Sequence, residues 1–258
     1  MRWRLADRLC VRAAQGSKTD TTWLKLYLRP PCVNIGSMQA SNSTSSVVRP
    51  YRGIAASDRV ASRRDALMRA GLQVFDTEGW SALSARRVCE IAGLTRRYFY
   101  ESFKDLDELL AAIYVAITGE AIAAIKAGLK TAANEKLGFG VRVERGIAAG
   151  LATLDPPVRG RYLVAIQRAG GVIAPFHAAV LDDLAALIGG AALITEDGPR
   201  SIEPATAKIA ARMVVGAGLA LAEGWFEGTV DLARDEIPVH AATAAVAIIE
   251  ALGNGACK

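Results

Sequence analysis

Residues 84–103 constrain the fold of this chain more than any other stretch, and they read SARRVCEIAGLTRRYFYESF. They predict two short helices joined by a tight turn at Ala92-Gly93-Leu94, where a glycine permits the positive φ that such a turn requires. Apolar residues three or four apart give each helix one buried face, namely Val88 with Ile91 and Phe99 with Phe103. This pattern is typical of a helix-turn-helix, whose second helix can enter the major groove of DNA.

A hydroxyl residue stands directly before each of these two helices. Ser84 precedes the first and Thr95 precedes the second. A side-chain oxygen at this position can accept a hydrogen bond from a backbone N–H that has no partner inside the helix. We therefore expect both residues to be N-caps, and both are also candidates for contact with a phosphate.

One helix is predicted before this motif and a longer one after it. The first begins near Ser57-Asp58 and stops at Gly79, and the second opens at Asp105, where Glu108 completes an acidic variant of a capping box. Apolar residues at helical spacing continue the second helix through Ile125. We expect it to connect a small three-helix domain to a larger one. Two residues that follow the first helix are expected to pack under the motif as core, Trp80 and Leu83.

The rest of the chain also shows helical patterns, interrupted by proline and glycine. Helices are predicted over about 139–154, 157–169, 173–194, 202–226 and 234–252, with Pro175 in a first turn and a loop at Asp197-Gly198-Pro199. The chain is 52% apolar but only 6% aromatic, which favours close helix packing over a β-sandwich. The fold class is therefore predicted to be all-α. The last two helices are apolar nearly all round, which indicates that part of their surface forms a subunit interface.

The charge of the chain is unevenly distributed. Residues 1–37 carry seven Lys/Arg and two acids, and residues 49–104 carry eleven and six, so each segment has a net charge of +5. Residues 105–258 carry thirteen Lys/Arg and eighteen acids, a net charge of −5. This asymmetry indicates that only the first half of the protein meets a polyanion.

Residues 1–50 differ from the rest, because arginines, Pro30-Pro31 and a Ser/Asn/Thr run follow each other without a sustained period. This composition predicts an extension without fixed structure. Either it is a basic arm that adds phosphate contacts, or the native protein begins at Met38 and residues 1–37 do not belong to it. We favour the second interpretation, since no amphipathic pattern organises the arginines.

The sequence offers little for catalysis or metal binding. Its four cysteines are scattered, its two histidines lie far apart, and neither a nucleophile motif nor a phosphate-cradling glycine loop is found. Cys89 is expected to be a small buried side chain. No uncharged apolar run is long enough to cross a membrane. We expect a soluble cytoplasmic protein that is not an enzyme and has no metal or cofactor.

With these helices placed, residues 64–110 resemble the DNA-binding domain of the TetR family of bacterial transcriptional regulators. The spacing from Gly79 through Ala92-Gly93 to Tyr100 and Phe103 is the most specific part of the resemblance. The remaining matching positions are Leu67, Ala70, Phe75, Trp80, Ser84, Val88, Cys89, Leu94, Thr95, Phe99 and Leu109. The C-terminal half resembles the family only in its helix count and in the junction at 224–236.

The resemblance implies a homodimer in which the last two helices of each subunit, about 202–226 and 234–252, form a four-helix bundle. It also implies a small-molecule pocket in the large domain, coupled to release from DNA. We accordingly expect a DNA-binding domain over 56–104 and a helical ligand-binding and dimerisation domain over 105–254. Many members carry lysine in the turn before the fourth helix, where this chain has Leu106, and the nearby Lys104 is a candidate for the same phosphate contact.

Helical phase sorts the residues of the second motif helix. With its two phenylalanines turned inward, Arg97, Tyr98 and Glu101 lie on the outward face, Tyr100 lies on the flank, and Arg96 lies nearer the buried side. Arg97 is the candidate for reading a guanine through two donors, and Tyr98 for packing on a thymine methyl or binding a phosphate. The candidate DNA-binding residues are Ser84, Thr95, Arg96, Arg97, Tyr98, Tyr100 and Lys104.

Polar residues within the apolar runs of the large domain are candidates for a ligand site, namely Arg161, Tyr162, Gln167, Arg168 and His177. The alternative for the two arginines is a solvated face, and for His177 a capping or surface position. These observations predict a repressor that binds a palindromic operator in double-stranded DNA as a homodimer and is released by a small-molecule effector. Two other classes stay open, a helical protein-interaction module without DNA binding and an all-α enzyme that uses the apolar cavity.

Overall fold

In the computed structural model of this chain, the described residues are 56–171, 173–192, 194–195, 198–199 and 203–253. The prediction for residues 1–50 lies outside them. The helices are α3 (Ala56–Glu78), a short 3₁₀ helix η1 (Trp80–Ala82), α4 (Ala85–Ala92), α5 (Arg96–Ser102), α6 (Leu106–Asn134), α7 (Phe139–Thr153), α8 (Val158–Ala169), α9 (Ala174–Ala192), α10 (Pro204–Phe226) and α11 (Glu236–Gly253).

The all-α fold class is confirmed, and the helices begin and end close to the predicted positions. Two short elements were not predicted. The first is η1, and the second is an antiparallel pair of two-residue strands, β1 (Ile194–Thr195) and β2 (Gly198–Pro199). The predicted loop at Asp197-Gly198-Pro199 therefore contains a strand. A pair this short has no sequence period, because alternation needs four or more residues to be visible.

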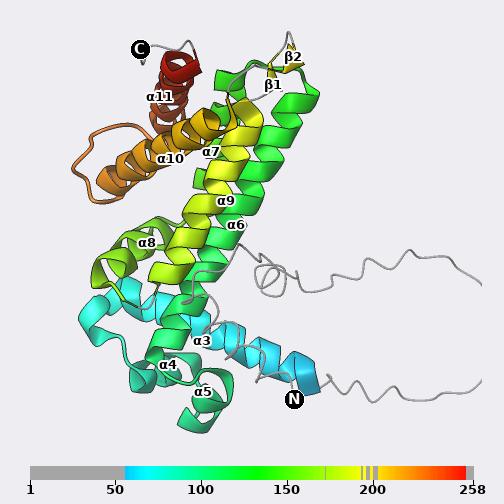
Figure 1. Ribbon diagram of the computed structural model, residues 1–258. Helices are drawn as coiled ribbons and strands as arrows, with labels where there is room; N and C mark the ends of the chain where they lie inside the picture. The colour runs from blue at the N-terminus through cyan, green and yellow to red at the C-terminus, as the bar shows by residue number, and fades with distance from the viewer. Residues whose placement is uncertain (1–55, 172, 193, 196–197, 200–202, 254–258) are drawn as a thin grey trace, which may run out of the picture.

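The helices form an elongated molecule with the helix-turn-helix at one end (Figure 1). α3, α4 and α5 make up that end, and α6 rises from it alongside α9. α7, α10 and α11 lie toward the opposite end, and α8 lies between that group and α3. Among the described helices, α6 is the one that runs from the small unit into the large one, as predicted.

α6 begins at a cap that uses both predicted acids. The Asp105 side chain accepts a hydrogen bond from the Glu108 N–H at 2.8 Å, and the Glu108 side chain accepts one from the Lys104 N–H at 2.7 Å. In a standard capping box the second bond returns to the N-cap residue itself. Here it returns one residue earlier, so that the chain is held on both sides of the helix start.

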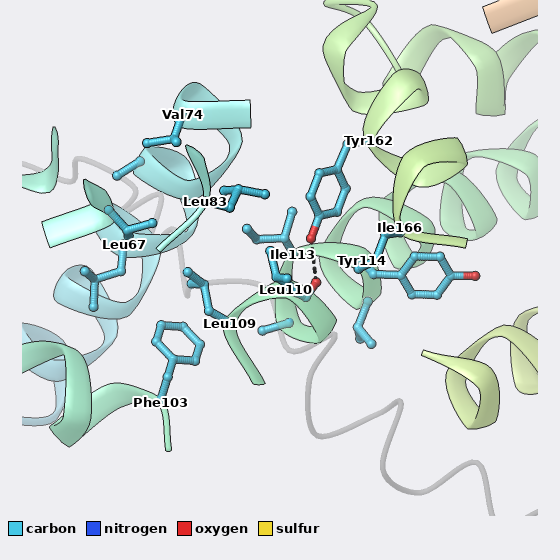
Figure 2. Packing of buried hydrophobic residues seen from close by; sticks show 14 of the residues in the cluster. Leu67, Val74, Leu83, Phe103, Leu109, Leu110, Ile113, Tyr114, Tyr162 and Ile166 are labelled. Carbon is cyan, nitrogen blue, oxygen red and sulfur yellow. Dashed lines mark hydrogen bonds between the residues drawn. The ribbon is translucent and has the colours of Figure 1, made fainter. Parts of the chain in front are cut away.

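One hydrophobic core runs through both units (Figure 2). α3, α4 and α5 contribute buried residues to it, the first half of α6 lies at its centre, and α8 closes it from the other side. The largest buried side chains of this core are Leu67, Val74, Val88, Phe99, Phe103, Leu109, Tyr114 and Tyr162. The small unit therefore has no core of its own that excludes α6.

Leu83 is buried as expected, and Trp80 is partly buried against the same core cluster. Its half-buried ring lies 6.2 Å from the Phe75 ring and 6.3 Å from the Tyr162 ring. Trp80 thus packs toward α8, because η1 turns the chain sideways after α3. The sequence carries no signal for this direction, since the partner on α8 is some eighty positions away.

α6 and α7 pack against each other through glycine. A Cβ at Gly150 would lie 2.5 Å from the Ile125 side chain, and one at Gly128 would lie 2.8 Å from the Arg145 carbonyl. Neither distance is possible for a real side chain, so these positions require glycine for the two helices to approach this closely. The glycine-bearing composition therefore serves helix contact in the large domain.

Two helices, α6 and residues 205–226 of α10, are long and apolar enough to cross a membrane by length and composition alone. More than half of the α6 window is buried inside the protein, as expected of a core helix. Only 28% of the α10 window is buried. α10 therefore presents apolar surface that the subunit itself does not cover.

A buried hydrogen bond joins α8 to α6 within the shared core. The Tyr162 hydroxyl donates to the Leu110 carbonyl at 2.8 Å (Figure 2). The Tyr162 side chain is fully buried, and this burial raises the pKa of its hydroxyl far above the ordinary value. The hydroxyl consequently stays protonated and acts as a permanent donor.

We predict that Tyr162→Phe destabilises the protein by about 0.5–1.5 kcal/mol, the usual net value of a hydrogen bond of this kind. The aromatic ring is kept, so the packing loss is small. Urea unfolding followed by circular dichroism measures the change. Tyr100→Phe, which removes an exposed hydroxyl, is the matched control and should leave the midpoint unchanged.

Candidate nucleic-acid interface

The turn between α4 and α5 has the geometry that its residues predict. The Ser84 hydroxyl accepts a hydrogen bond from the Arg87 N–H at 3.2 Å and caps α4. Gly93 ends α4 in the left-handed region, with φ of 64° and ψ of 28°. The Leu94 N–H then donates to the Cys89 carbonyl at 3.0 Å, which closes the helix end. The glycine is needed here because a side chain would be strained at this φ.

Thr95 occupies the N-cap position of α5, but its side chain makes no capping hydrogen bond. The expectation of a side-chain cap at Thr95 is therefore wrong in this structure, while that for Ser84 is confirmed. The two residues differ in backbone conformation, with φ of −155° at Ser84 and −77° at Thr95. Thr95 is exposed, so its hydroxyl is accessible to an external acceptor or donor.

α5 presents polar residues to solvent on the side away from its buried phenylalanines, Phe99 and Phe103. The Arg97 side chain is 85% exposed, and Tyr100 is 60% exposed. Arg96 is exposed as well, although helical phase placed it nearer the buried side. Arg96 is the first residue of the seven-residue α5.

Glu101 lies between two arginines on this surface. Its carboxylate accepts a hydrogen bond from Arg97 Nε at 2.9 Å and lies 4.0 Å from the Arg63 guanidinium. Exposed ion pairs of this kind contribute only about 0–1 kcal/mol each. Arg97 can therefore leave Glu101 at little cost, and Arg63 keeps the carboxylate partly neutralised when it does.

Tyr98 is half-buried and less outward than predicted. The Arg63 guanidinium lies 4.3 Å from the centroid of its ring, in a cation–π contact that covers one face. Helical phase within α5 could not reveal this contact, because Arg63 comes from α3. The hydroxyl end of Tyr98 is the part that remains available to a nucleic acid.

Arg64 fixes the other end of α5. Its guanidinium donates to the Ser102 carbonyl at 2.6 Å and stacks 4.1 Å from the Phe103 ring centroid. Arg63 and Arg64 are neighbours on α3, and each contacts α5 or the residue after it. Both in fact hold α5 against α3, and their separation of 35 or more residues from their partners explains why no local pattern predicted this.

Arg86 and Arg87 are paired with acids on the surface. Arg87 makes a fork of hydrogen bonds to Glu78 at 2.7–2.9 Å, and both arginines bond Glu90. Their positive charge is thus largely balanced. Arg96, Arg97 and Lys104 are the exposed cations at and just after α5, so the candidate interface centres on that helix.

The five candidate ligand residues do not meet in one pocket. Gln167 is exposed on α8, Tyr162 is fully buried, and His177 on α9 bonds the Tyr114 hydroxyl through Nδ1 at 3.0 Å. Arg161 and Arg168 line an open cleft of about 460 Å³. The other lining residues are Trp80, Val164, Ala165, Ala169, Phe226 and Glu227, of which Trp80 and Phe226 were not predicted as ligand residues.

Comparison with known proteins agrees with this geometry. Residues 67–113 match the family described as "Bacterial regulatory proteins, tetR family". A search of curated proteins finds no significant match. The matched segment covers α4, α5, the second half of α3 and the start of α6, which are the elements that build the interface.

Solved structures resemble the whole fold at low sequence identity. A TetR family transcription regulator from Marinobacter aquaeolei is 17% identical with a TM-score of 0.52, over 74% of this chain and 97% of that one. A tetR-family transcriptional regulator from Streptomyces coelicolor is also 17% identical, with a TM-score of 0.53 over 75% and 87% of the two chains. A TetR transcriptional regulator from Rhodococcus is 13% identical, with a TM-score of 0.51 over 74% and 97%. At these identities the likeness concerns the fold.

The helix-turn-helix, the all-α architecture and the family match together define a DNA-binding transcriptional regulator. Residues 67–113 carry the DNA-binding segment of the TetR family of bacterial regulatory proteins, and the chain shares its fold with solved regulators of that family. The resemblance drawn from residues 64–110 is thereby confirmed. The roles of the individual residues on α5 remain predictions.

We predict that Arg97→Ala reduces binding to the specific operator by about 5–150-fold, because a two-donor contact with guanine contributes about 1–3 kcal/mol of discrimination. Base preference should relax at one position of the site. Fluorescence anisotropy with the operator and with random DNA measures both effects. Equal losses on the two DNAs would contradict the assignment of Arg97 to base reading.

Tyr100→Phe should behave differently, since its exposed hydroxyl is assigned to a phosphate. We expect affinity for all sequences to fall by a similar factor, with base preference unchanged, in the same anisotropy assay. A loss confined to one base position would instead place Tyr100 at a base edge.

Proposed function

We propose that this protein is a repressor that binds a palindromic operator as a homodimer and is released by a small-molecule effector. The observation that carries the dimer is the uncovered apolar face of α10. The proposal keeps the division into a DNA-binding domain over 56–104 and a ligand-binding and dimerisation domain over 105–254. It also places the protein in the cytoplasm, where such a regulator meets DNA.

The uncovered face of α10 follows helical spacing. Ile209 is 58% exposed and Met213 is 51% exposed, and both are large apolar side chains in contact with solvent. Small exposed residues continue the same face one and two turns later, namely Gly216, Ala217 and Ala220. Val239 on α11 is also exposed. A contiguous apolar surface of this kind is typical of a protein–protein interface, and small residues allow two helices to approach closely.

A second copy of the chain is the occupant that we propose for this face. α10 and α11 pack against each other within one subunit. Two copies related by a two-fold axis would bury both exposed faces in a four-helix bundle. The same axis relates the two α5 helices, so the operator should be an inverted repeat with half-site centres about one helical turn or a little more apart.

We propose that the effector binds more tightly to a dimer conformation that cannot bind DNA. Its binding then shifts the population of dimers toward that conformation and releases the operator. α6 supports it physically, because its first half lies in the core of the DNA-binding unit and its second half packs on α7. A displacement of α6 in the large domain must therefore change the packing under α4 and α5. Coupling free energies of this kind are about 1–3 kcal/mol.

The alternative is a helical protein-interaction module that does not bind DNA. A salt-dependent gel shift with the DNA upstream of the gene separates the two, because phosphate contacts make DNA affinity fall steeply with salt. Selection of bound sequences from a random pool then defines the operator. Recovery of sequences without an inverted repeat would contradict binding as a two-fold dimer.

We predict that the double substitution Ile209→Asp with Met213→Asp converts the dimer to a monomer, since it places two charges in an apolar contact. Sedimentation velocity measures the change, and operator affinity should fall by at least tenfold because each half-site then binds alone. Val141→Asp is the matched control, since Val141 is an exposed apolar residue on α7 and belongs to neither α10 nor α11. A double variant that stays dimeric would place the interface elsewhere.

A further inference from the structure

We propose that the open cleft between α8, Trp80 and the end of α10 is the effector site, and that it takes an aromatic or otherwise apolar molecule with one carboxylate. This inference rests on the proposed function, because it names the place and the chemistry of the ligand that releases the DNA. The cleft holds about 460 Å³, enough for a small aromatic acid.

Apolar side chains make up most of the cleft. Trp80 and Phe226 supply aromatic surface from two different elements, and Val164, Ala165 and Ala169 supply the face of α8 between them. Small residues on α8 leave the space open, while the rings on either side offer flat surfaces. A planar apolar group can therefore stack within the cleft and remove these surfaces from water.

The Phe226 side of the cleft is held in place by packing. A Cβ at position 160 would lie 2.0 Å from Phe226 Cζ, so Gly160 is required for the ring to rest on α8. Next to it, Trp225 Nε1 donates to the Leu232 carbonyl at 2.9 Å and fixes the end of α10. The cleft wall is thus pre-formed and needs little ordering when a ligand binds.

The charged side chains that line the cleft sum to +1 before the neighbouring Asp76 and Glu223 are counted. Two arginines and one glutamate are among its lining residues, namely Arg161, Arg168 and Glu227. The arginines are seven residues apart on α8, which places them on one face about 10 Å from each other. Val164 and Ala165 lie between them on the same face. An apolar body on these two residues therefore brings a carboxylate within reach of either guanidinium.

Both arginines are paired with carboxylates that a ligand can replace, of which the Asp76 and Glu223 side chains are 43% exposed and that of Glu227 is 21% exposed. Arg161 pairs with Asp76 at 2.5 Å, and Arg168 pairs with Glu227 and, at 3.7 Å, with Glu223. Exposed ion pairs of this kind are weak because water and salt screen them. A carboxylate that is anchored by an apolar group has a high local concentration and competes well against them.

The same groups connect the cleft to the DNA-binding unit. Asp76 lies on α3, so the Arg161–Asp76 pair ties α8 to the helix that holds α5. Trp80 follows α3 directly and contacts both Phe75 and Tyr162. A ligand that takes over Arg161 and stacks on Trp80 therefore changes two of the contacts between α8 and the DNA-binding unit.

The test uses the full chain and 2-naphthoate as the probe, measured by isothermal titration calorimetry. The neutral 2-naphthamide and the cationic 2-naphthylmethylamine have the same ring system. We expect the carboxylate to bind at least tenfold more tightly than either. Arg161→Ala and Arg168→Ala should each weaken 2-naphthoate at least threefold, whereas Asp76→Asn should strengthen it because it frees Arg161.

A steric variant locates the site. Ala169→Trp fills the cleft from an exposed position of α8 and should abolish 2-naphthoate binding. Ala148→Trp, at an exposed position of α7, is the matched control and should bind as the wild type does. Binding of 2-naphthoate that survives Ala169→Trp, or that is no tighter than binding of the amide, would overturn the inference. An Ala169→Trp chain that loses its dimer would show that a second subunit covers the cleft, which would also overturn it.

The link to DNA is measured separately. Saturating 2-naphthoate should lower operator affinity at least fivefold in the wild type and leave it unchanged in Ala169→Trp. Release of the operator by another compound in the Ala169→Trp protein would overturn this effector site while leaving the proposed repressor function intact. A protein that binds 2-naphthoate in the cleft but no DNA would instead contradict the proposed function alone.

Discussion

The placement of the first half of α6 is the constraint on which the rest of this structure depends. Residues 109–115 of this helix are buried on every side, which is unusual for a helix in a small domain. They fill the space beneath α3, α4 and α5 and at the same time meet α8. Close-packed interiors transmit displacements instead of absorbing them. A movement of α6 in the large domain is therefore expected to shift the DNA-binding unit as well.

α8 is attached to α6 and α3 by two kinds of contact that differ in strength, one buried hydrogen bond and two ion pairs at the surface. Toward α6 it is held by a buried bond between Tyr162 and the Leu110 carbonyl, which water cannot replace. Toward α3 and the middle of α6 it is held by ion pairs at the surface, Arg161 with Asp76 and Arg159 with Glu120. The buried contact sets where α8 sits, while the surface contacts can exchange without any loss of core packing.

Most of the fold could be predicted from the sequence, because helix ends are set by local chemistry. Ser84, Gly93 and the Asp105 cap each act on neighbours within a few residues, and the structure confirms all three. The contacts that position the interface could not be predicted. Arg63 and Arg64 stabilise α5 from α3, and Trp80 turns toward α8, so their partners are distant in sequence and close only after folding. Thr95 is at an N-cap position but makes no side-chain capping bond, so the rule that a hydroxyl residue caps a helix also depends on the φ angle at that position.

The ion pair between Glu101 and Arg97 affects how the protein would distinguish its operator from other DNA. A guanidinium that already faces a carboxylate offers less net charge to the phosphates, so Arg97 adds little to sequence-independent attraction. If Arg97 reads a guanine as we propose, the two acceptors of that base would replace the carboxylate. The internal carboxylate thus acts as a resident counter-ion. In the proposed complex, this pairing would lower the number of salt ions released at this position and widen the difference in affinity between specific and non-specific DNA.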